Sequence, residues 1–166
     1  MKKRIIIGAI ALVLAVALVF GVVAVVKGVK RKAISDFMTV ASVYFEATKT
    51  GNNELMSIAD TYDNYSAWGD FEEATKQVEE RLGKYNGLSF EVDKAYEEVK
   101  NYEIKYEEAR EIKAIAETHY AQYKKFEDNI LNHSEENYGE DYGKVYKEWQ
   151  IPFADEHHKL RFALAE

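Results

Sequence analysis

The sequence predicts an all-α protein in which a single N-terminal transmembrane helix continues into an elongated antiparallel helical bundle with one long coiled-coil-like helix. Three observations support this fold class. The chain has 166 residues with one proline and nine glycines, a composition that favours long helices over strands and tight turns. Its N-terminus holds a long apolar run. Beyond that run, apolar residues recur every three or four positions, which is the period of a helix packed on one face.

The apolar run at residues 5–26 predicts a membrane anchor. These 22 residues carry no charge. At about 1.5 Å per residue such a helix reaches roughly 33 Å, enough to cross a hydrocarbon core of about 30 Å. A cleaved signal peptide is the alternative, but its apolar region is usually about 7–15 residues long. Here Ala15 and Ala17 are followed by more apolar chain, so we expect an uncleaved span.

Basic residues flank both ends of this span. The short tail 1–4 and the juxtamembrane collar 27–32 together contain Lys2, Lys3, Arg4, Lys27, Lys30, Arg31 and Lys32. The positive-inside rule compares such clusters and finds a near tie here. A short charged tail resists translocation, so we expect the N-terminus inside and the domain at residues 33–166 outside the cytoplasm. A cytoplasmic domain is the alternative.

Small residues recur along one face of the span at positions i, i+4, i+7 and i+11. They are Ala17, Gly21, Ala24 and Gly28. Such a stripe allows two helices to approach closely in lipid, so it is the predicted packing site of a homo-oligomer. Alanine and glycine are also common in membrane helices that pack with nothing, and that simpler interpretation stays open.

The domain that follows is strongly acidic. Seven of the 22 Lys and Arg lie in residues 1–32, which hold no Asp or Glu, so residues 33–166 carry 15 basic and 29 acidic side chains, a net charge of −14. Phosphate contacts supply most of the affinity for nucleic acid, so this charge excludes a nucleic-acid partner. The chain has no cysteine, which excludes disulfides and thiol catalysis.

Apolar spacing and helix-breaking residues divide the domain into helices. We expect helices at about 33–50, 54–67, 70–86, 89–132, 144–150 and 152–165. The breaks between the first four are placed at Gly51-Asn52-Asn53, Trp68-Gly69-Asp70 and Asn86-Gly87, because glycine and asparagine favour helix ends and Asp70 favours a helix start. Pro152 is expected to begin the last helix.

The longest predicted helix carries an apolar seam from Val92 to Ile130. Its members are spaced three or four residues apart, and the spacing averages about 3.5, as in a coiled coil. No glycine or proline interrupts residues 89–132, so a continuous helix is expected. Two packed halves with a break between them are the alternative.

Tyrosine is the distinctive residue of the domain, with 12 copies in the chain. Most of them lie on the seams that would form the core. Aromatic residues also gather near the C-terminus, at Tyr138, Tyr142, Tyr146, Trp149 and Phe153. Rigid aromatic side chains are effective at interfaces, so this cluster is the candidate contact surface for a partner protein.

No residue pattern predicts catalysis, a metal or a cofactor. Asp155 and His158 share a helix face, but two ligands do not make a metal site. His157 is expected on a solvated face and His119 at the boundary of the seam. Adjacent glutamates do not face each other on a helix, and no nucleophile elbow, phosphate-binding loop or dinucleotide fingerprint is present. We expect that the protein is not an enzyme.

Two short stretches are similar to parts of a known repeat. Gly69-Asp70-Phe71-Glu72-Glu73-Ala74 resembles the turn and second helix of a tetratricopeptide repeat, and Ile58-Ala59-Asp60-Thr61-Tyr62 is similar to its first helix. The resemblance implies a peptide-binding module. The interval between Ala59 and Gly69 is about one turn too long for that repeat.

The sequence therefore predicts a membrane-anchored, non-catalytic scaffold or adaptor that binds a partner protein at the membrane. Its expected partners are the lipid bilayer and an unidentified protein, for which further copies of the chain are one candidate. A small structural subunit of a larger membrane complex, or a homo-oligomer, each ordered by its neighbours, is the first alternative. A tetratricopeptide-like peptide-binding module is the second.

Overall fold

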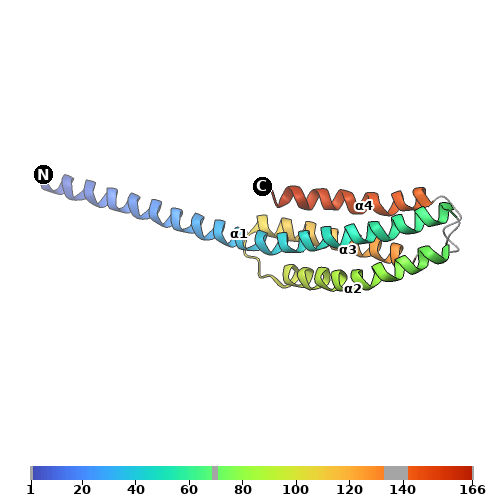
Figure 1. The fold of residues 1–166 in the computed structure, drawn as a ribbon. Helices are drawn as coiled ribbons and strands as arrows, with labels where there is room; N and C mark the ends of the chain where they lie inside the picture. The colour runs from blue at the N-terminus through green and yellow to red at the C-terminus, as the bar shows by residue number, and fades with distance from the viewer. Residues whose placement is uncertain (1, 69–70, 133–141, 166) are drawn as a thin grey trace. The chain divides into compact units, whose positions relative to one another are not determined.

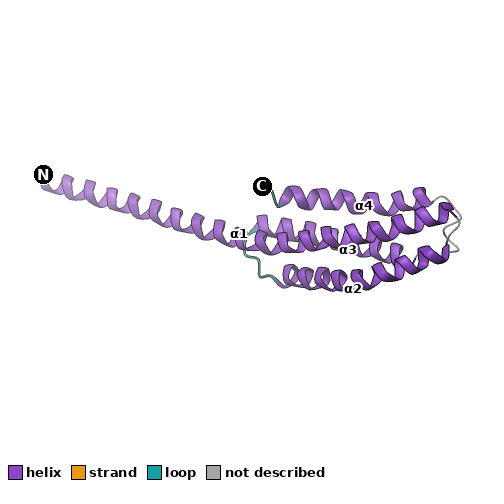
Figure 2. Cartoon of the chain, in the orientation of Figure 1, coloured by secondary structure: helices purple, strands orange, loops and turns teal. Residues whose placement is uncertain are grey.

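The computed structural model describes residues 2–68, 71–132 and 142–165, and nearly all of them are helical (Figure 2). Side chains are described within these ranges except at residues 2–22, 63–68, 71, 74 and 142–147. The helices are α1 (Lys2–Trp68), α2 (Phe71–Asn101), α3 (Glu107–Leu131) and α4 (Tyr142–Ala163). The predicted all-helical class is confirmed.

The chain divides into two compact units, Met1–Asp36 and Phe37–Glu166. The first unit contains the N-terminal half of α1. The second contains the rest of α1 together with α2, α3 and α4, and within it successive helices run in opposite directions (Figure 1). This second unit is the predicted antiparallel bundle.

No helix in the described part of the chain combines the length and the apolar composition that crossing a membrane requires. Residues 5–22 of the predicted anchor lie outside the residues whose side chains are described. The anchor therefore stays a prediction.

Helix α1 does not end at Gly51-Asn52-Asn53, so the expected helices 33–50 and 54–67 are one continuous helix. Gly51 is buried and faces α3. A Cβ placed on it would overlap the hydroxyl of Tyr123 and lie 3.4 Å from Cγ2 of Val92. The glycine makes room for a neighbouring helix, and its cost inside a helix is only about 1 kcal/mol relative to alanine.

Of two further helix boundaries, one agrees with the prediction and the other does not. The predicted break at Trp68-Gly69-Asp70 coincides with the end of α1 at Trp68 and the start of α2 at Phe71, while Gly69 and Asp70 themselves lie outside the described residues. The predicted end at Asn86-Gly87 is wrong, because α2 continues to Asn101. Tyr85 and Val92, on either side of Gly87, are both fully buried, so packing holds the helix across the glycine.

The predicted continuous helix 89–132 is interrupted at residues 102–106, where the chain reverses between α2 and α3. The structure has the alternative arrangement of two packed halves. The two halves of the seam face each other, and the rings of Tyr96 and Tyr120 stack with centroids 3.7 Å apart. The same apolar seam is compatible with one long helix and with a hairpin of two helices. Each helix needs one buried face in either arrangement.

Helix α4 is one element in place of the two expected at 144–150 and 152–165, and Pro152 lies inside it. Proline removes one backbone hydrogen bond from a helix interior. Phe153 and Leu160, both beyond the proline, are buried in the bundle. Their packing stabilises the helix across the missing bond.

Side chains from all four helices form the core of the second unit. Those that are almost completely buried include Phe37, Ala41, Tyr44, Leu55, Ile58, Val78, Tyr85, Val92, Val99, Ala116, Tyr123, Phe126, Ile130, Phe153 and Leu160. Most seam positions predicted from the sequence are therefore core positions, although the helices that carry them are bounded differently.

Candidate functional site

The described part of the N-terminal unit exposes apolar side chains. The valines are Val23, Val25, Val26 and Val29, with exposed fractions of 44%, 66%, 57% and 57%. Clustered exposed apolar surface on a helix marks a contact with a membrane or a protein. This surface directly continues the apolar run of the sequence.

Half of the predicted small-residue stripe is described. Ala24 and Gly28 are exposed, and a Cβ on Gly28 would meet nothing within 4 Å. Ala17 and Gly21 lie outside the residues whose side chains are described. The described half of the stripe is thus an open helix face in the single chain.

The predicted juxtamembrane collar, residues 27–32, lies on the same helix. Lys27, Arg31 and Lys32 are exposed, while Lys30 is partly buried. The tail residues Lys2, Lys3 and Arg4 belong to α1, but their side chains are not described. The described collar is therefore a basic segment that follows Val23–Val26 and contains the exposed Val29.

The predicted C-terminal contact cluster is only partly described. Tyr138 lies outside the described residues, and Tyr142 and Tyr146 are placed only as backbone of α4. Trp149 is partly exposed. Phe153 is 3% exposed, and its ring stacks on that of Phe126 with centroids 5.7 Å apart. Phe153 is thus a core residue and offers no surface to a partner.

A chain of hydrogen-bonding side chains crosses the bundle from α1 through α3 to α4. The hydroxyl of Tyr44 lies 2.7 Å from Nδ1 of His119. The other ring nitrogen of that histidine, Nε2, lies 3.1 Å from Nδ1 of His157. His119 and Tyr44 are both completely buried. Each nitrogen of His119 therefore has a partner on a different helix.

Aromatic rings enclose this chain. Phe45 stacks on His157 with ring centroids 4.4 Å apart, and Phe153 lies 5.2 Å from the ring of His119. Burial, together with the nearby His157, lowers the pKa of His119 to about 3. The group is therefore neutral at ordinary pH, as a histidine in an apolar site must be.

His157 is influenced by charges at the edge of the bundle. Burial lowers its pKa first, and the positive charges of His158, Lys49 and Arg161 lower it further, whereas Glu46 acts in the opposite direction. The placement of both histidines differs from the prediction. His119 is not at the boundary of the seam, because it is completely buried. His157 does not lie on a fully solvated face, because its ring contacts His119 on α3 and stacks on Phe45 of α1.

A second polar cluster joins α2 to α3 around the buried carboxylate of Glu127. Tyr85 donates a hydrogen bond to its Oε1 at 2.7 Å, and Ser89 donates to the same oxygen at 2.5 Å. Oε2 forms an ion pair with Lys124. Because Tyr85 uses its hydrogen on Glu127, the hydroxyl of Tyr123, 2.9 Å away, donates to Tyr85. The charge is thus paired, as a buried charge must be.

Asp93 extends this cluster toward the surface. It accepts a hydrogen bond from Tyr120 at 2.8 Å and lies 3.4 Å from Nζ of Lys124. Burial raises the pKa of Tyr44, Tyr85, Tyr120 and Tyr123. These phenols therefore remain protonated and serve as hydrogen-bond donors.

Glu127 was not singled out from the sequence, although a signal exists. It lies seven residues after Tyr120 and four after Tyr123, on the face of the seam. A charged residue at such a position predicts a buried and paired group. The order of residues alone does not say which tyrosine or serine provides the pairing.

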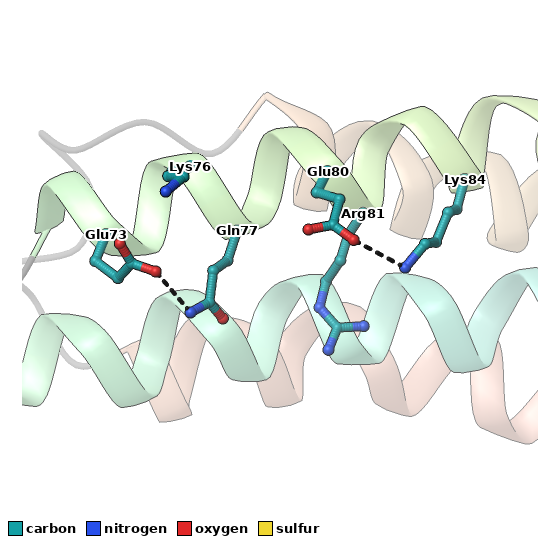
Figure 3. Close-up of a pocket in the computed structure, with 6 residues that line it drawn as sticks. All are labelled: Glu73, Lys76, Gln77, Glu80, Arg81 and Lys84. Atoms are coloured by element: carbon teal, nitrogen blue, oxygen red, sulfur yellow. Dashed lines mark hydrogen bonds and ion pairs between the residues drawn. The ribbon is translucent and has the colours of Figure 1, made fainter.

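A polar depression lies on α2 and is lined by Glu73, Lys76, Gln77, Glu80, Arg81 and Lys84 (Figure 3). Its side chains pair among themselves and with α1. Gln77 donates to Glu73, and Lys84 pairs with Glu80 (Figure 3). Arg81 pairs with Glu54 of α1 at 3.1 Å. Among the charged groups that line the depression, Glu80, Arg81 and Lys84 are thus already paired with opposite charges.

The described side chains contain no group of three or more His, Cys, Asp or Glu that could hold a metal ion. Within the described residues, hydrogen bonds between buried polar side chains connect the helices of the bundle. No family model, no curated protein and no solved structure matches this chain.

Proposed function

We propose that this protein is a single-pass membrane protein whose acidic helical bundle is a non-catalytic scaffold for a partner protein next to the bilayer. One observation carries the proposal. Helix α1 passes without interruption from the apolar N-terminal run into the bundle, and the described end of that run exposes valines from Val23 to Val29. A lipid bilayer is the environment in which such a surface is stable.

The charge of the chain supports a partner with a basic surface. Residues 33–166 carry 29 acidic and 15 basic side chains, and opposite charge speeds association and selects partners. Tyr85, Tyr123 and Glu127 satisfy one another inside the bundle, so they are not binding groups. The partner contacts the outer faces of the helices, and its binding weakens as salt increases.

The anchor is tested by alkaline extraction of membranes from cells that make the full chain. We expect the wild type to stay in the membrane pellet. A variant with Leu14→Lys and Leu18→Lys should be released, because each charge in the centre of a span costs about 2.5–3.5 kcal/mol. The matched control is Val43→Lys, which places the same side chain at an exposed position of the bundle and should stay in the pellet. Release of the wild type would refute the anchor.

The topology is tested by protease treatment of a C-terminal tag in sealed cells or vesicles. Cleavage from outside would support a domain beyond the cytoplasm. Protection that ends on permeabilisation would place the domain in the cytoplasm, with the collar at Lys27–Lys32 as the inside signal.

A homo-oligomer or a subunit of a larger complex is the alternative that a specific observation favours. Ala24 and Gly28 lie on an open helix face, where a second helix can approach closely. Gly21→Leu with Gly28→Leu should then reduce cross-linking between two differently tagged copies in the membrane. The peptide-binding alternative has less support, because α2 has 31 residues and the resemblance implies shorter paired helices.

A further inference from the structure

The hydrogen-bonded chain of Tyr44, His119 and His157 joins three helices of the bundle, and we call these three residues the histidine latch. We propose that the histidine latch holds α4 against the bundle only while its histidines are not both protonated. Mild acid then releases α4 from α1 and α3, while α2 and α3 stay packed. The inference goes beyond the scaffold function, because it concerns how the bundle itself is regulated.

The geometry of the latch does not accommodate a positive charge on both His119 and His157. A neutral histidine has one N–H donor and one acceptor nitrogen, and a protonated histidine has two donors. The 3.1 Å contact between Nε2 of His119 and Nδ1 of His157 needs one donor and one acceptor. If both rings are protonated, two N–H groups point at each other and two positive charges lie side by side. The contact then becomes repulsive.

One proton on His157 alone can be accommodated. Its Nδ1–H then donates to Nε2 of His119, whose Nδ1–H donates to the hydroxyl oxygen of Tyr44. This shift reverses both hydrogen bonds without moving a ring, and the hydroxyl hydrogen of Tyr44 no longer has Nδ1 of His119 as its acceptor. The latch therefore holds until His119 also gains a proton, and this group is completely buried.

The charges around the latch do not neutralise that second proton. From α1, Lys49 repels and Glu46 attracts a positive charge on His157, and from α4 His158 and Arg161 repel it. On the inner side, Tyr44 is influenced by Asp93 and Tyr96 of α2 and by Tyr120 and Tyr123 of α3. Within this set only Glu46 and Asp93 are anionic, and Asp93 already accepts from Tyr120 and pairs with Lys124.

Helix α4 is the element that this repulsion would release. Phe153, Leu160 and His157 bury it against the bundle. The described hydrogen-bond partners of Glu127, Tyr85 and Ser89, lie on α2, so this cluster joins α2 to α3. Once released, a helix of 22 residues that contains Pro152 has little stability of its own in water. Its backbone amides should then exchange with solvent.

The expected size of the acid effect follows from the linkage between proton binding to His119 and the release of α4. The pKa of His119 is about 3 in the packed bundle and about 6.5 for a solvated histidine. Between pH 7.5 and pH 5.0 this difference increases the equilibrium constant for release of α4 roughly 30-fold. Above pH 5 most carboxylates of ordinary pKa remain ionised, so the cluster around Glu127 and Asp93 should persist.

The experiment is hydrogen–deuterium exchange of the full chain in detergent micelles at pH 7.5 and pH 5.0. Rates are corrected for the intrinsic pH dependence of exchange. We expect the protection of amides in Phe153–Ala163 to fall roughly 30-fold, while amides in Val78–Val99 of α2 keep their protection. Unchanged protection of α4, or an equal loss in both helices, would overturn the proposal.

Variants separate the latch from a general effect of acid. His119→Gln keeps a hydrogen-bonding group near Nε2 but cannot gain a proton, and it should remove most of the loss in α4. His158→Asn is the matched control, because it removes an exposed histidine from the same helix. Its charge acts on His157 and not on His119, so this variant should respond to acid nearly as the wild type does. His157→Asn, at the partly exposed partner, provides a second test and should reduce the loss. A response to acid in His119→Gln as large as that of the wild type would also overturn the proposal.

Discussion

The hydroxyl of Tyr123 on α3 lies directly over the backbone of Gly51 on α1, in the space that a Cβ would occupy. Tyr123 cannot easily move away, because it is completely buried and its hydroxyl bonds to Tyr85 at 2.9 Å. The glycine therefore sets how closely α1 and α3 approach.

Gly51→Ala should destabilise the bundle. Alanine is the better helix former by about 1 kcal/mol, but the added methyl group overlaps a fixed phenol, and overpacking of this kind costs about 1–3 kcal/mol. We expect a net loss, measured as a lower midpoint of urea unfolding in detergent.

Gly83→Ala and Gly87→Ala are the matched controls on α2, where an added Cβ meets nothing within 4 Å. Each should stabilise the bundle by about 0.5–1 kcal/mol, because only the gain in helix propensity remains. A stabilised Gly51→Ala variant would contradict the close approach of α1 and α3.

Phe153→Ala should cost about 3–5 kcal/mol, since it removes a large side chain from a packed core. Its ring touches those of His119, Tyr123 and Phe126. Ile151→Ala, two residues earlier on α4 and 57% exposed, should change stability by less than about 0.5 kcal/mol. Thermal unfolding of both variants checks the contrast. Equal effects would mean that α4 is not packed as described.

Glu127→Ala should destabilise the bundle by about 3 kcal/mol, because it leaves Tyr85, Ser89 and Lys124 without their shared acceptor. Glu127→Gln keeps one oxygen acceptor and should cost less. Chemical unfolding of the two variants gives the comparison. If glutamine is as harmful as alanine, the negative charge matters more than the hydrogen bonds.

The free energy of unfolding should fall as the pH decreases from about 6.5 toward 3. The pKa of His119 is lower in the folded protein, at about 3, than the value of about 6.5 in an unfolded chain. The unfolded state therefore binds the extra proton in this window. The contribution of His119 to stability is complete above this window and is lost within it, by up to about 1.4 kcal/mol per pH unit.

Urea unfolding at several pH values measures this slope. His119→Gln should flatten it, and His158→Asn should leave it almost unchanged. A slope that is identical in the wild type and His119→Gln would assign the acid sensitivity to other groups.

Apolar periodicity was enough to predict the helical class and most of the core. Val92, Val99, Ala116 and Tyr123 lie on the predicted seam and are buried. Periodicity reports which face of a helix is buried, and this information is the same for a straight helix and for a hairpin. The reversal at residues 102–106 contains no glycine or proline, so no local signal marked it.

Glycine positions were the least informative signal for the boundaries of the helices. Gly51 and Gly87 look alike in the sequence, but one is buried under Tyr123 and the other is open to solvent. Both lie inside helices because tertiary packing of flanking residues outweighs a penalty of about 1 kcal/mol. The histidine latch depends on contacts between residues 75 and 38 positions apart, which a pattern along one chain does not contain.

The order of the helices has a consequence for the kinetics of folding. Helices that follow each other in the sequence pack against each other, α2 on α3 and α3 on α4. Folds dominated by such local contacts form quickly. The contact between Tyr44 and His119 joins residues 75 positions apart, so its loop-closure entropy is larger. We therefore expect the α2–α3 hairpin to form early, and the docking of α1 onto it to be the slow step.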